Sequence, residues 1–288
     1  MSITWPPPRR RVRLRVALPT NVLSEAPSLR EKTIKIGIIG RALAIFRVDE
    51  VVFYRRRPDE GKLIRDLMRY HFTPPYLKKY IPLRTELRYA GLLPPLKAPA
   101  HTTPVDVEGA LRYGYREGIV LVKRGLSAIL DVGMRYRALL PNARDRRRGD
   151  HVLVRILGLK GRYLLSRLVK EEQVPFYWRP HIGRTYNSLK GLIKSEYEKG
   201  LLVGTSKWGT PISKAMERMV KRAIGRGEML LIFGAPDEGL YEMAKDEGFA
   251  LEDEIPYVVN FIPQQGVETV RTEEALFATL AILNESIP

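Results

Sequence analysis

The sequence contains no cysteine, and this absence excludes several kinds of chemistry. Disulfide bonds and thiolate metal sites are ruled out, and so is any mechanism in which a cysteine thiolate adds to a pyrimidine ring. The four histidines lie far apart, and no pair has the spacing of metal ligands. No window approaches twenty consecutive apolar residues, and the N-terminal arginines lead into alternating Val and Leu, not into an apolar signal core. We therefore expect a soluble, cytoplasmic protein with no membrane segment and no metal.

Three common catalytic and nucleotide-binding motifs are also missing. No GxGxxG follows the first predicted strand, which disfavours a Rossmann dinucleotide site, and no GxxxxGK[ST] is present to form a P-loop. The serine-hydrolase motif GxSxG is absent as well. The chemistry must therefore be sought in other loops.

Positive charge is abundant and unevenly distributed. The 49 Lys and Arg against 32 Asp and Glu give a net charge of +17, which is typical of a protein with a polyanionic partner such as nucleic acid. Residues 225–288 contain three basic and thirteen acidic side chains, so this segment carries −10 and residues 1–224 carry +27. An ion-paired surface of the thermophile type would also favour Arg and Glu, but balanced networks do not produce so large a net charge.

The hydrophobic pattern predicts an α/β fold interrupted once by a small β domain. Residues 11–18 alternate Arg with Val or Leu and predict a strand, which is followed by a helix within 27–47 and by the strand DEVVFY. After a helix at about 59–70 and a Pro-rich stretch, the pattern changes to short strands until about residue 178. Helices and strands then alternate again, which is typical of a parallel sheet covered by helices. The predicted domains are 1–100 plus 179–288, and an inserted domain at 101–178.

Further boundaries are predicted in the C-terminal half. A helix near 185–199 precedes the strand LLVGT, and the next helix begins at Thr210 and Pro211, where Thr is expected to cap the free amides. Gly225 and Gly227 are expected to end this helix. The strand MLLIF, a helix near 238–247, the strand PYVVNF and a last helix at about 272–284 complete the pattern.

The inserted segment looks like a basic β-barrel. Five strand-like runs, separated by Gly, Pro and Arg-rich turns, occur within about seventy residues. Residues 101–178 carry fifteen Lys or Arg against eight acids, with the dense basic turn ARDRRRGD at 143–150. Small OB-like barrels commonly bind oligonucleotides, so Arg144, Arg146, Arg147 and Arg148 are candidate RNA-binding residues. A solvated turn that only maintains solubility is the alternative.

Three loops that each follow a short apolar strand are the candidate binding loops. They are GTSKWG at 204–209, GAPDEG at 234–239, and IPQQGVETVRTEEA at 262–275. Ligands collect at the carboxyl ends of strands in open parallel sheets, so the three loops are expected to meet at one pocket. Taken singly, each Gly is as well explained by a turn, and Thr272, Glu273 and Glu274 by a helix start.

Several segments resemble one family of RNA-modifying enzymes. NFIPQQGVETVRTEEALFATLAILN at 260–284 resembles the C-terminal knot motif of the SPOUT-class (α/β-knot) RNA methyltransferases that carry an inserted OB-like domain. RVALP, AIFRVDEVV, AGLLPPL, YREGIV, GTS and LIFGAPDEGL match in family order along the chain. This subfamily includes the archaeal and eukaryotic enzymes assigned to N3 methylation of uridine in large-subunit ribosomal RNA.

The resemblance implies a trefoil knot near the C-terminus, a homodimer formed through the knotted domain, and S-adenosylmethionine as cofactor. It also implies a set of cofactor-binding positions. Carried over by position, these are Thr205, Trp208, Phe233, Gly234, Ala235, Asn260, Ile262, Pro263, Gln265, Gly266 and Val270. Relatives often have Glu and Arg where this chain has Lys207 and Trp208, so the resemblance does not fix the side-chain role of that loop.

Methylation at N3 requires the uridine to lose the N3 proton, so the site must stabilise a delocalised anion. Arg271, between the Gln-Gly turn and the last helix, is the candidate catalytic residue for this role. Candidate bases are Glu273, Glu274 and Asp237, each of which is equally well explained as structural. Two alternatives stay open: a catalytically silent RNA-binding or ribosome-assembly factor, and a 2′-O-methyltransferase acting on ribose.

Overall fold

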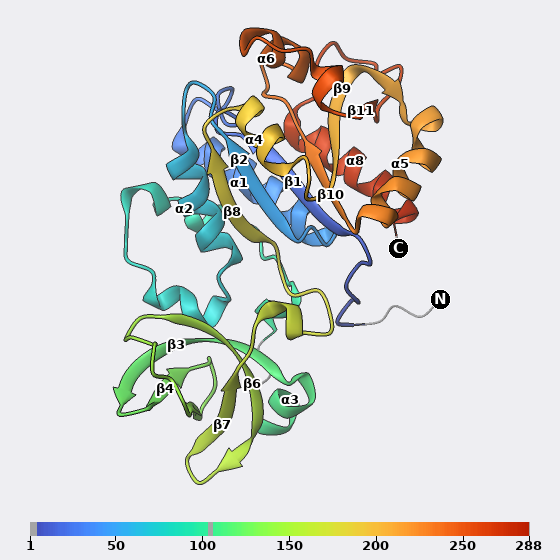
Figure 1. Cartoon of the computed structure of the whole chain (residues 1–288). Helices are drawn as coiled ribbons and strands as arrows, with labels where there is room; N and C mark the ends of the chain where they lie inside the picture. The colour runs from blue at the N-terminus through green and yellow to red at the C-terminus, as the bar shows by residue number, and fades with distance from the viewer. Residues whose placement is uncertain (1–4, 103–105, 288) are drawn as a thin grey trace. The chain divides into compact units, whose positions relative to one another are not determined.

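The chain folds into two compact units, each assembled from three segments (Figure 1). The computed structural model describes residues 5–102 and 106–287. The larger unit comprises residues 9–72, 84–96 and 179–288, and the smaller comprises 1–8, 73–83 and 97–178. Whether residues 101–178 fold as an independent domain stays a prediction.

A six-stranded parallel sheet forms the larger unit. Its strands, in spatial order, are β11 (Tyr257–Asn260), β9 (Leu201–Pro211), β10 (Glu228–Ile232), β1 (Arg13–Pro19), β2 (Glu50–Tyr54) and β8 (His181–Tyr186). The strands come from both ends of the chain, because β1 pairs with β2 on one side and with β10 on the other. The predicted parallel α/β sheet is therefore confirmed.

The first βαβ unit follows the sequence pattern closely. Between β1 and β2 runs α1 (Leu29–Ile45), which begins after Ser28. The Ser28 hydroxyl accepts a hydrogen bond from the Glu31 backbone N–H at 3.2 Å, and the Glu31 carboxylate accepts one from the Ser28 N–H at 3.1 Å. This capping box satisfies two amides that a helix start otherwise leaves unpaired, and it fixes where α1 begins.

Helices cover both faces of the sheet (Figure 1). The others in the larger unit are α2 (Gly61–Phe72), α4 (Leu189–Glu196), α5 (Ile212–Arg226), α6 (Leu240–Asp246), α7 (Leu251–Glu254) and α8 (Thr272–Ser286). Two short 3₁₀ helices lie at Thr85–Leu87 and Ala90–Leu92. Helices α4, α6 and α7 pack on one face, whereas α1 and α8 lie together, with the rings of Phe46 and Phe277 5.9 Å apart.

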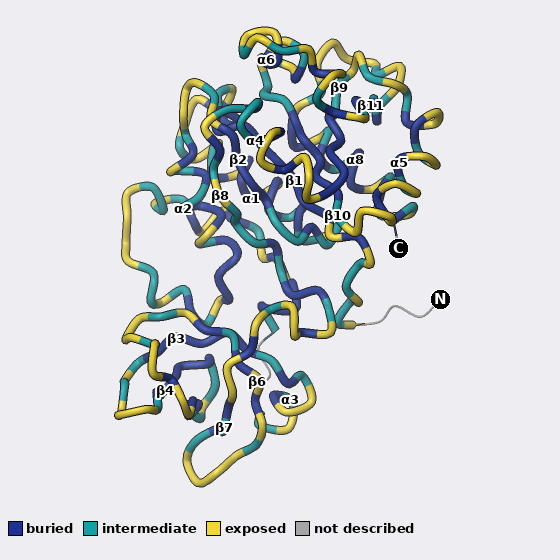
Figure 2. The backbone as a smooth tube through the Cα atoms, viewed as in Figure 1, coloured by how far each residue is buried: buried dark blue, intermediate teal, exposed yellow. Residues whose placement is uncertain are grey.

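Alternating side chains divide the strands between two hydrophobic layers. Ala17, Val52 and Leu230 point into the layer under α4, α6 and α7, and their neighbours along each strand point to the opposite face. Both sets of strand residues are buried, as the dark tube through the sheet shows (Figure 2). Burial on both faces explains why these strands appear in the sequence as continuous apolar runs.

Two sequence-based boundaries are wrong, and one is right. The helix predicted near 185–199 is shorter, because residues 181–186 form the edge strand β8. The helix predicted to begin with a Thr210 cap has Pro211 at the cap position and no side-chain cap, because β9 continues through Thr210 to Pro211. Gly227 ends this helix in the left-handed conformation, as predicted, at φ +70°.

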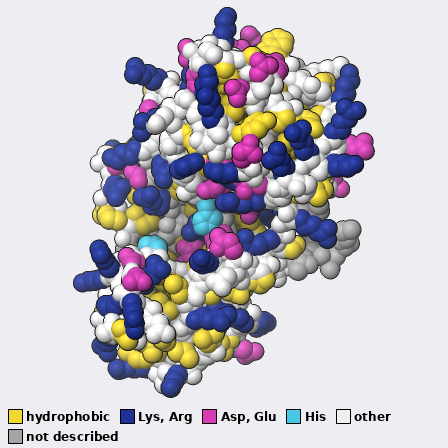
Figure 3. Space-filling model, viewed as in Figure 1, with side chains coloured by type: hydrophobic (Ala, Val, Ile, Leu, Met, Phe, Trp, Pro, Cys, Tyr) yellow, Lys and Arg dark blue, Asp and Glu magenta, His cyan; other side chains and the backbone are white. Residues whose placement is uncertain are grey.

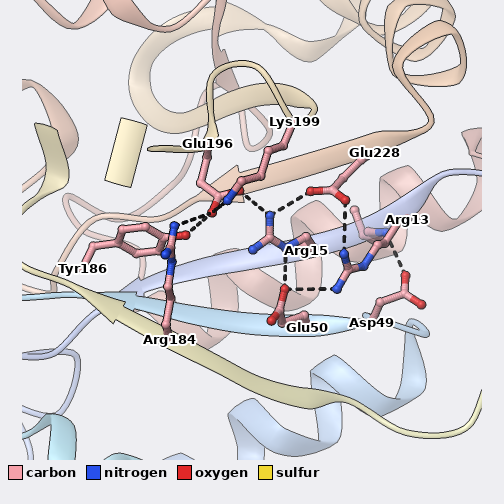
Figure 4. Close-up of polar contacts among 10 residues, drawn as sticks. Arg13, Arg15, Asp49, Glu50, Arg184, Tyr186, Glu196, Lys199 and Glu228 are labelled. Carbon is pink, nitrogen blue, oxygen red and sulfur yellow. Dashed lines mark hydrogen bonds and ion pairs between the residues drawn. The ribbon is translucent and has the colours of Figure 1, made fainter. Parts of the chain in front are cut away.

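A charge network joins the amino-terminal ends of the central strands β10, β1 and β2 to the end of α4 (Figure 4). The guanidinium of Arg15 contacts three carboxylates: Glu50 at 2.7 Å, Glu196 at 2.5 Å and Glu228 at 2.8 Å. Glu196 also accepts hydrogen bonds from Lys199, at 2.8 Å, and from the Tyr186 hydroxyl. Burial would lower the pKa of Arg15, but the surrounding carboxylates outweigh this and raise it.

The smaller unit contains a closed five-stranded barrel. Its strands are β3 (Tyr115–Arg124), β4 (Ser127–Asp131), β5 (Arg137–Leu140), β7 (Tyr163–Leu168) and β6 (His151–Lys160), in this order around the barrel. All pairings are antiparallel except β5 with β7. Helix α3 (Val107–Tyr113) and the 3₁₀ helices Pro75–Tyr80, Pro99–His101 and Glu171–Gln173 complete the unit. The predicted small barrel and its five strands are confirmed.

Asp131 joins the segment 73–83 to the barrel. This buried carboxylate, at the end of β4, accepts hydrogen bonds from the Tyr80 hydroxyl at 2.5 Å and from the Gly133 N–H at 2.9 Å. Lys79 and Arg137 pair with it at 2.7 and 2.6 Å. Burial would raise the pKa of Asp131, but these donors outweigh it and hold the pKa well below its usual range. Residues 73–83 of the Pro-rich stretch are thus part of the barrel unit, whereas residues 84–96 belong to the larger unit.

Candidate functional site

The three loops singled out from the sequence meet at one cavity of about 280 Å³. It lies at the carboxyl ends of β9, β10 and β11, which is where ligands bind in open parallel sheets. The lining consists of residues 205–208, 233–239, 259–262 and 268–270, together with Glu242, Gln265 and the α8 residues Thr272, Ala275 and Thr279. The whole cavity belongs to the larger unit.

The first wall is a bulge within β9. Gly204 pairs with Val258 and Thr210 pairs with Val259, so residues 205–209 leave the ladder and protrude toward the cavity. Gly209 lies directly against β11, because a Cβ at this position would stand 2.6 Å from the Val258 carbonyl oxygen. A glycine is therefore required where the bulge rejoins the ladder.

The bulge is fixed by hydrogen bonds to neighbouring strands. The Thr205 hydroxyl donates to the Ile232 carbonyl oxygen at 3.1 Å, and the Asn260 side-chain amide donates to the Lys207 carbonyl oxygen at 2.8 Å. The Lys207 ammonium donates to the Glu268 carbonyl oxygen at 3.2 Å. These bonds connect the bulge to the ends of β10 and β11 and to the third loop.

The second wall is the loop after β10. Tyr54, fully buried at the end of β2, donates its hydroxyl proton to the Phe233 carbonyl oxygen at 2.5 Å. Burial raises the pKa of Tyr54 well above its usual value, so the hydroxyl remains a donor. The loop closes on itself through the Ala235 N–H and the Glu238 carbonyl oxygen, 2.9 Å apart.

The third wall is the segment between β11 and α8. The Asn260 carboxamide oxygen accepts from the Ile262 N–H at 2.9 Å, which begins the turn. The Gln265 amide donates to the carbonyl oxygens of Val267 and Glu268, at 2.8 and 3.0 Å. Gln264 sits at φ +58°, in the left-handed region. Side-chain amides thus hold a turn that has no regular secondary structure.

Acidic side chains outnumber basic ones in the lining. The lining contains four acidic residues, Asp237, Glu238, Glu242 and Glu268, and one basic residue, Lys207. Glu238 is paired with Arg56 at 2.5 Å, and Asp237 accepts a hydrogen bond from Ser24 at 2.9 Å. The excess of carboxylate favours a ligand that carries positive charge. Within residues 5–102 and 106–287, His, Asp and Glu form no group of three that could hold a metal ion.

Most of the positions implied by the family resemblance lie at the cavity. Those in its lining are Thr205, Trp208, Phe233, Gly234, Ala235, Asn260, Ile262, Gln265 and Val270. Pro263 and Gly266 lie in the same turn but outside the lining, and Arg271 is an exposed residue at the cap of α8. Their roles in binding and catalysis stay predictions.

The three candidate bases have different surroundings. Glu273 is buried and pairs with Lys35 at 3.0 Å, and Glu274 accepts a hydrogen bond from the Arg271 N–H at 2.9 Å at the start of α8. Both carboxylates thus have structural partners. Asp237 also has a partner, the Ser24 hydroxyl at 2.9 Å, but it is the candidate base that lines the cavity.

Sequence reasoning did not find Tyr54 or Glu242. Tyr54 ends a buried apolar strand and looks like an ordinary core residue, because its hydroxyl contact depends on β1 pairing with both β2 and β10. Glu242 is one acid among many in an acidic segment. No spacing signal marks either residue.

The basic turn of the barrel presents its guanidinium groups to solvent. Arg144, Arg147 and Arg148 are exposed and Arg146 is half-buried. The Lys123 ammonium donates hydrogen bonds to the carbonyl oxygens of Ala143, Arg144 and Arg146, and these bonds fix the backbone of the turn. Among the described residues, no carboxylate lies within ion-pair distance of these four guanidinium groups.

Lys and Arg side chains are spread over the whole face shown in Figure 3, and fewer Asp and Glu side chains lie scattered among them. In the part of the chain that the structure describes, no helix is both long and apolar enough to cross a membrane.

Comparison with known proteins gives consistent matches along nearly the whole chain. The model of a family described as "Putative RNA methyltransferase" matches residues 13–283. An uncharacterized protein of Haloarcula marismortui is 32% identical over 93% of this chain and 97% of its own length. The 28S rRNA (uridine-N(3))-methyltransferases of Drosophila melanogaster and Homo sapiens are 28% and 29% identical over 95% of this chain, and cover 62% and 78% of their own lengths.

Proposed function

Because this chain belongs to the RNA methyltransferase family whose model it matches over residues 13–283, we propose that it methylates N3 of a uridine in large-subunit ribosomal RNA. The observation that carries this proposal is the similarity to two 28S rRNA uridine-N3 methyltransferases over 95% of the chain. The similarity includes all three loops of the cavity, so it extends to the part of the molecule where chemistry is expected.

The methyl donor in this proposal is S-adenosylmethionine. Its sulfonium and ammonium groups outweigh its one carboxylate, so it is a cation, and the carboxylate-rich cavity suits a cation. Phe233, Gly234, Ala235, Ile262 and Val270 would hold its apolar and adenine parts. Thr205, Asn260 and Gln265 fix the loop backbones around it, and Pro263 and Gly266 shape the turn. When bound, the cofactor supplies an electrophilic methyl group.

The protein's part in the reaction is to present N3 and remove its proton. N3 lies between two carbonyl groups, so deprotonation spreads negative charge over N3 and the two carbonyl oxygens. A nearby cation stabilises this charge. Asp237 would accept the N3 proton, the N3–methyl bond would form, and the sulfur–methyl bond would break. Arg271, exposed beside the cavity loops, is the proposed cation. The absence of cysteine excludes C5 methylation through a thiolate adduct.

The proposal includes two features of the fold, an OB-like barrel and a C-terminal knot. The barrel's strand order, with its parallel pairing of the third and fifth strands, supports an OB-like RNA-binding module. The C-terminal path supports a SPOUT-type knot: β11 lies at the edge beyond β9, yet the chain returns through residues 261–271 so that α8 packs on α1.

A homodimer formed through α1 and α8 is also proposed. Ile34, Ile38 and Ile45 on α1 are 36%, 38% and 47% exposed, although this helix already packs on α2 and α8. When the apolar surface of a helix extends beyond the stripe that packs on its neighbours, a further protein surface usually covers it. Ile38→Lys should convert a dimer to a monomer in light-scattering measurements, whereas the exposed Leu126→Lys on the barrel should leave the mass unchanged.

The first test is nucleoside mass spectrometry of ribosomal RNA from cells with and without this chain. Loss of 3-methyluridine, restored by purified protein with labelled S-adenosylmethionine, is the expected result. A methyl group found on ribose would point instead to 2′-O-methylation. An unchanged nucleoside profile together with tight RNA binding would indicate a silent ribosome-assembly factor.

A further inference from the structure

Trp208 is a large aromatic side chain exposed beside the cavity. It lines the cavity and is 70% exposed, whereas Trp178, in the smaller unit, is 2% exposed. Leaving an indole ring in water forfeits much of the stabilisation that its burial would provide, so an exposed Trp beside a pocket suggests a ligand that covers it. The family resemblance places Trp208 among the cofactor residues, but a ring this exposed is poorly placed to be enclosed with the cofactor.

The backbone beneath Trp208 is held in place, so the ring projects from a fixed base. The Trp208 N–H donates to the Ser206 hydroxyl at 3.2 Å, and the preceding carbonyl oxygen, that of Lys207, accepts from Asn260 at 2.8 Å. The following residue, Gly209, lies against the β11 backbone. A ring on such a base loses little freedom when a ligand binds to it.

The ring has a cation at one side and an unused donor. The Lys207 ammonium lies 5.3 Å from the indole centroid, within cation–π range. Within residues 5–102 and 106–287, the indole N–H has no hydrogen-bond partner. The site thus offers a π surface, a hydrogen-bond donor and one positive charge together, a combination that suits a nucleobase with its anionic backbone.

We infer that Trp208 stacks on the target uracil and holds its N3 edge at the mouth of the cofactor cavity. The inference rests on the proposed function, because N3 lies on the pairing edge and a base methylated there must leave its stack. A base that leaves its stack needs a new stacking partner, and in the described part of the cavity lining Trp208 is the exposed large aromatic side chain. Trp208 is thus a positioning residue for the RNA and not a cofactor ligand.

The kinetic test compares Trp208→Ala with Trp208→Phe, which keeps an aromatic face. Stacking on an aromatic side chain is worth about 5- to 150-fold in affinity per base, so the Ala variant should raise the KM for ribosomal RNA from deficient cells by a factor in this range. The Phe variant should recover most of the loss. Affinity for S-adenosylmethionine, measured by calorimetry without RNA, should stay within about twofold in both variants, because stacking on RNA does not involve the cofactor.

Trp5→Ala is the matched control, since Trp5 is also exposed, at 57%, but lies in the smaller unit. Unchanged thermal midpoints would show that all three variants fold. The inference is overturned if Trp208→Ala weakens cofactor binding while leaving RNA affinity intact, or if it alters neither.

A second measurement does not depend on catalysis. In a Trp5→Phe background, a short oligouridylate should quench the exposed Trp208 fluorescence, and the additional Trp208→Phe change should abolish the quenching, leaving only buried Trp178. An abasic oligomer of equal charge should quench little. Quenching without N3 methylation would refute the proposed function and support the stacking site. Methylation without quenching would support the proposed function and refute the stacking site.

Discussion

Tyr54 supports one wall of the cavity through its hydroxyl group. Its hydrogen bond to the Phe233 carbonyl oxygen fixes the backbone where β10 ends and the cavity loop begins. Phe233 is 1% exposed, so its carbonyl oxygen has poor access to water as a substitute partner. A single core hydroxyl therefore links the buried sheet to the geometry of the proposed cofactor site.

Tyr54→Phe should lower both stability and cofactor affinity. Leaving a buried carbonyl unpaired costs about 1–3 kcal/mol, and the released loop should bind S-adenosylmethionine more weakly. Urea unfolding and calorimetric titration measure the two effects. Tyr257→Phe is the control, because the half-buried Tyr257 makes no side-chain hydrogen bond among the described residues, and it should change stability by less than about 0.5 kcal/mol. Equal effects from both variants would contradict this role for Tyr54.

Glu196 makes stability depend on pH. Burial would raise its pKa, but hydrogen bonds from Arg15, Lys199 and Tyr186 outweigh burial and lower the pKa from 4.5 to about 2. Because the folded state holds the carboxylate below its unfolded pKa, the stabilisation is fully present above pH 4.5 and is lost as the pH falls through 2. A shift of this size corresponds to about 3 kcal/mol.

Glu196→Gln tests this linkage. The variant should be less stable than the native protein at pH 7, and the difference should shrink as the pH falls from 4.5 toward 2, as measured by urea unfolding at several pH values. Glu285→Gln, which removes an exposed carboxylate of α8, should leave the pH profile unchanged. A difference that stays constant down to pH 2 would show that the stabilisation does not come from ionisation of Glu196.

At the scale of elements, the β9 bulge depends on the close approach of Gly209 to β11. In Gly209→Ala, the new methyl group would stand 2.6 Å from the Val258 carbonyl oxygen, so β9 and β11 must separate or the bulge must move. We expect a lower melting temperature and weaker S-adenosylmethionine binding, measured by scanning calorimetry and titration calorimetry.

Gly225→Ala is a matched control on the next element. Gly225 lies within α5 and a Cβ there meets no atom within 4 Å, so the change should stabilise the protein by about 0.5–1 kcal/mol through helix propensity. If Gly209→Ala behaves like Gly225→Ala, the close approach of Gly209 to β11 has no structural importance.

The sequence predicted helices and strands well where one hydrophobic period dominates. It predicted them poorly where contacts between distant residues decide the local conformation. The helix α1 carries an apolar stripe and a capping box, and its position follows from local chemistry. The edge strand β8 was missed because HIGRTY is half-exposed and does not alternate, so only its pairing with β2 makes it a strand. The bulge in β9 depends on the register with β11, which a local pattern does not encode.

The candidate site was predictable to a similar extent. Three strand-ending loops were enough to expect one pocket, because parallel topology brings carboxyl ends together. Which carboxylates line that pocket was not predictable: Glu273 pairs with Lys35, Glu274 accepts from the Arg271 N–H, and Asp237 lies in the lining with Ser24 as its partner. Lys35 and Ser24 lie far away in the sequence from the carboxylates that they contact.

At the scale of the whole molecule, RNA binding should depend on where positive charge lies and not only on its amount. Reversing Arg146, Arg147 and Arg148 to Glu should weaken RNA binding and reduce the slope of log affinity against log salt by about 2–3. Filter binding at several salt concentrations measures both quantities. An unchanged slope would count against the barrel turn as an RNA contact.

The control for this experiment makes the same change in net charge elsewhere. Lys214, Arg218 and Lys221 are exposed on α5, and reversing them leaves the barrel intact. If the two triple variants lose affinity equally, RNA responds to overall charge and the barrel has no special role.

The strand order has a consequence for synthesis of the chain on the ribosome. Every segment of the smaller unit has been translated once residue 178 is made, and its five strands follow one another within 115–168. Strand β1, near the N-terminus, must wait for β10 at 228–232 before both its edges are paired. We therefore expect the barrel to form during translation, while the sheet and the cavity at its edge are completed only as the last sixty or so residues emerge. A truncated messenger RNA would leave a nascent chain with a finished barrel, the proposed RNA-binding module, and without the proposed catalytic site.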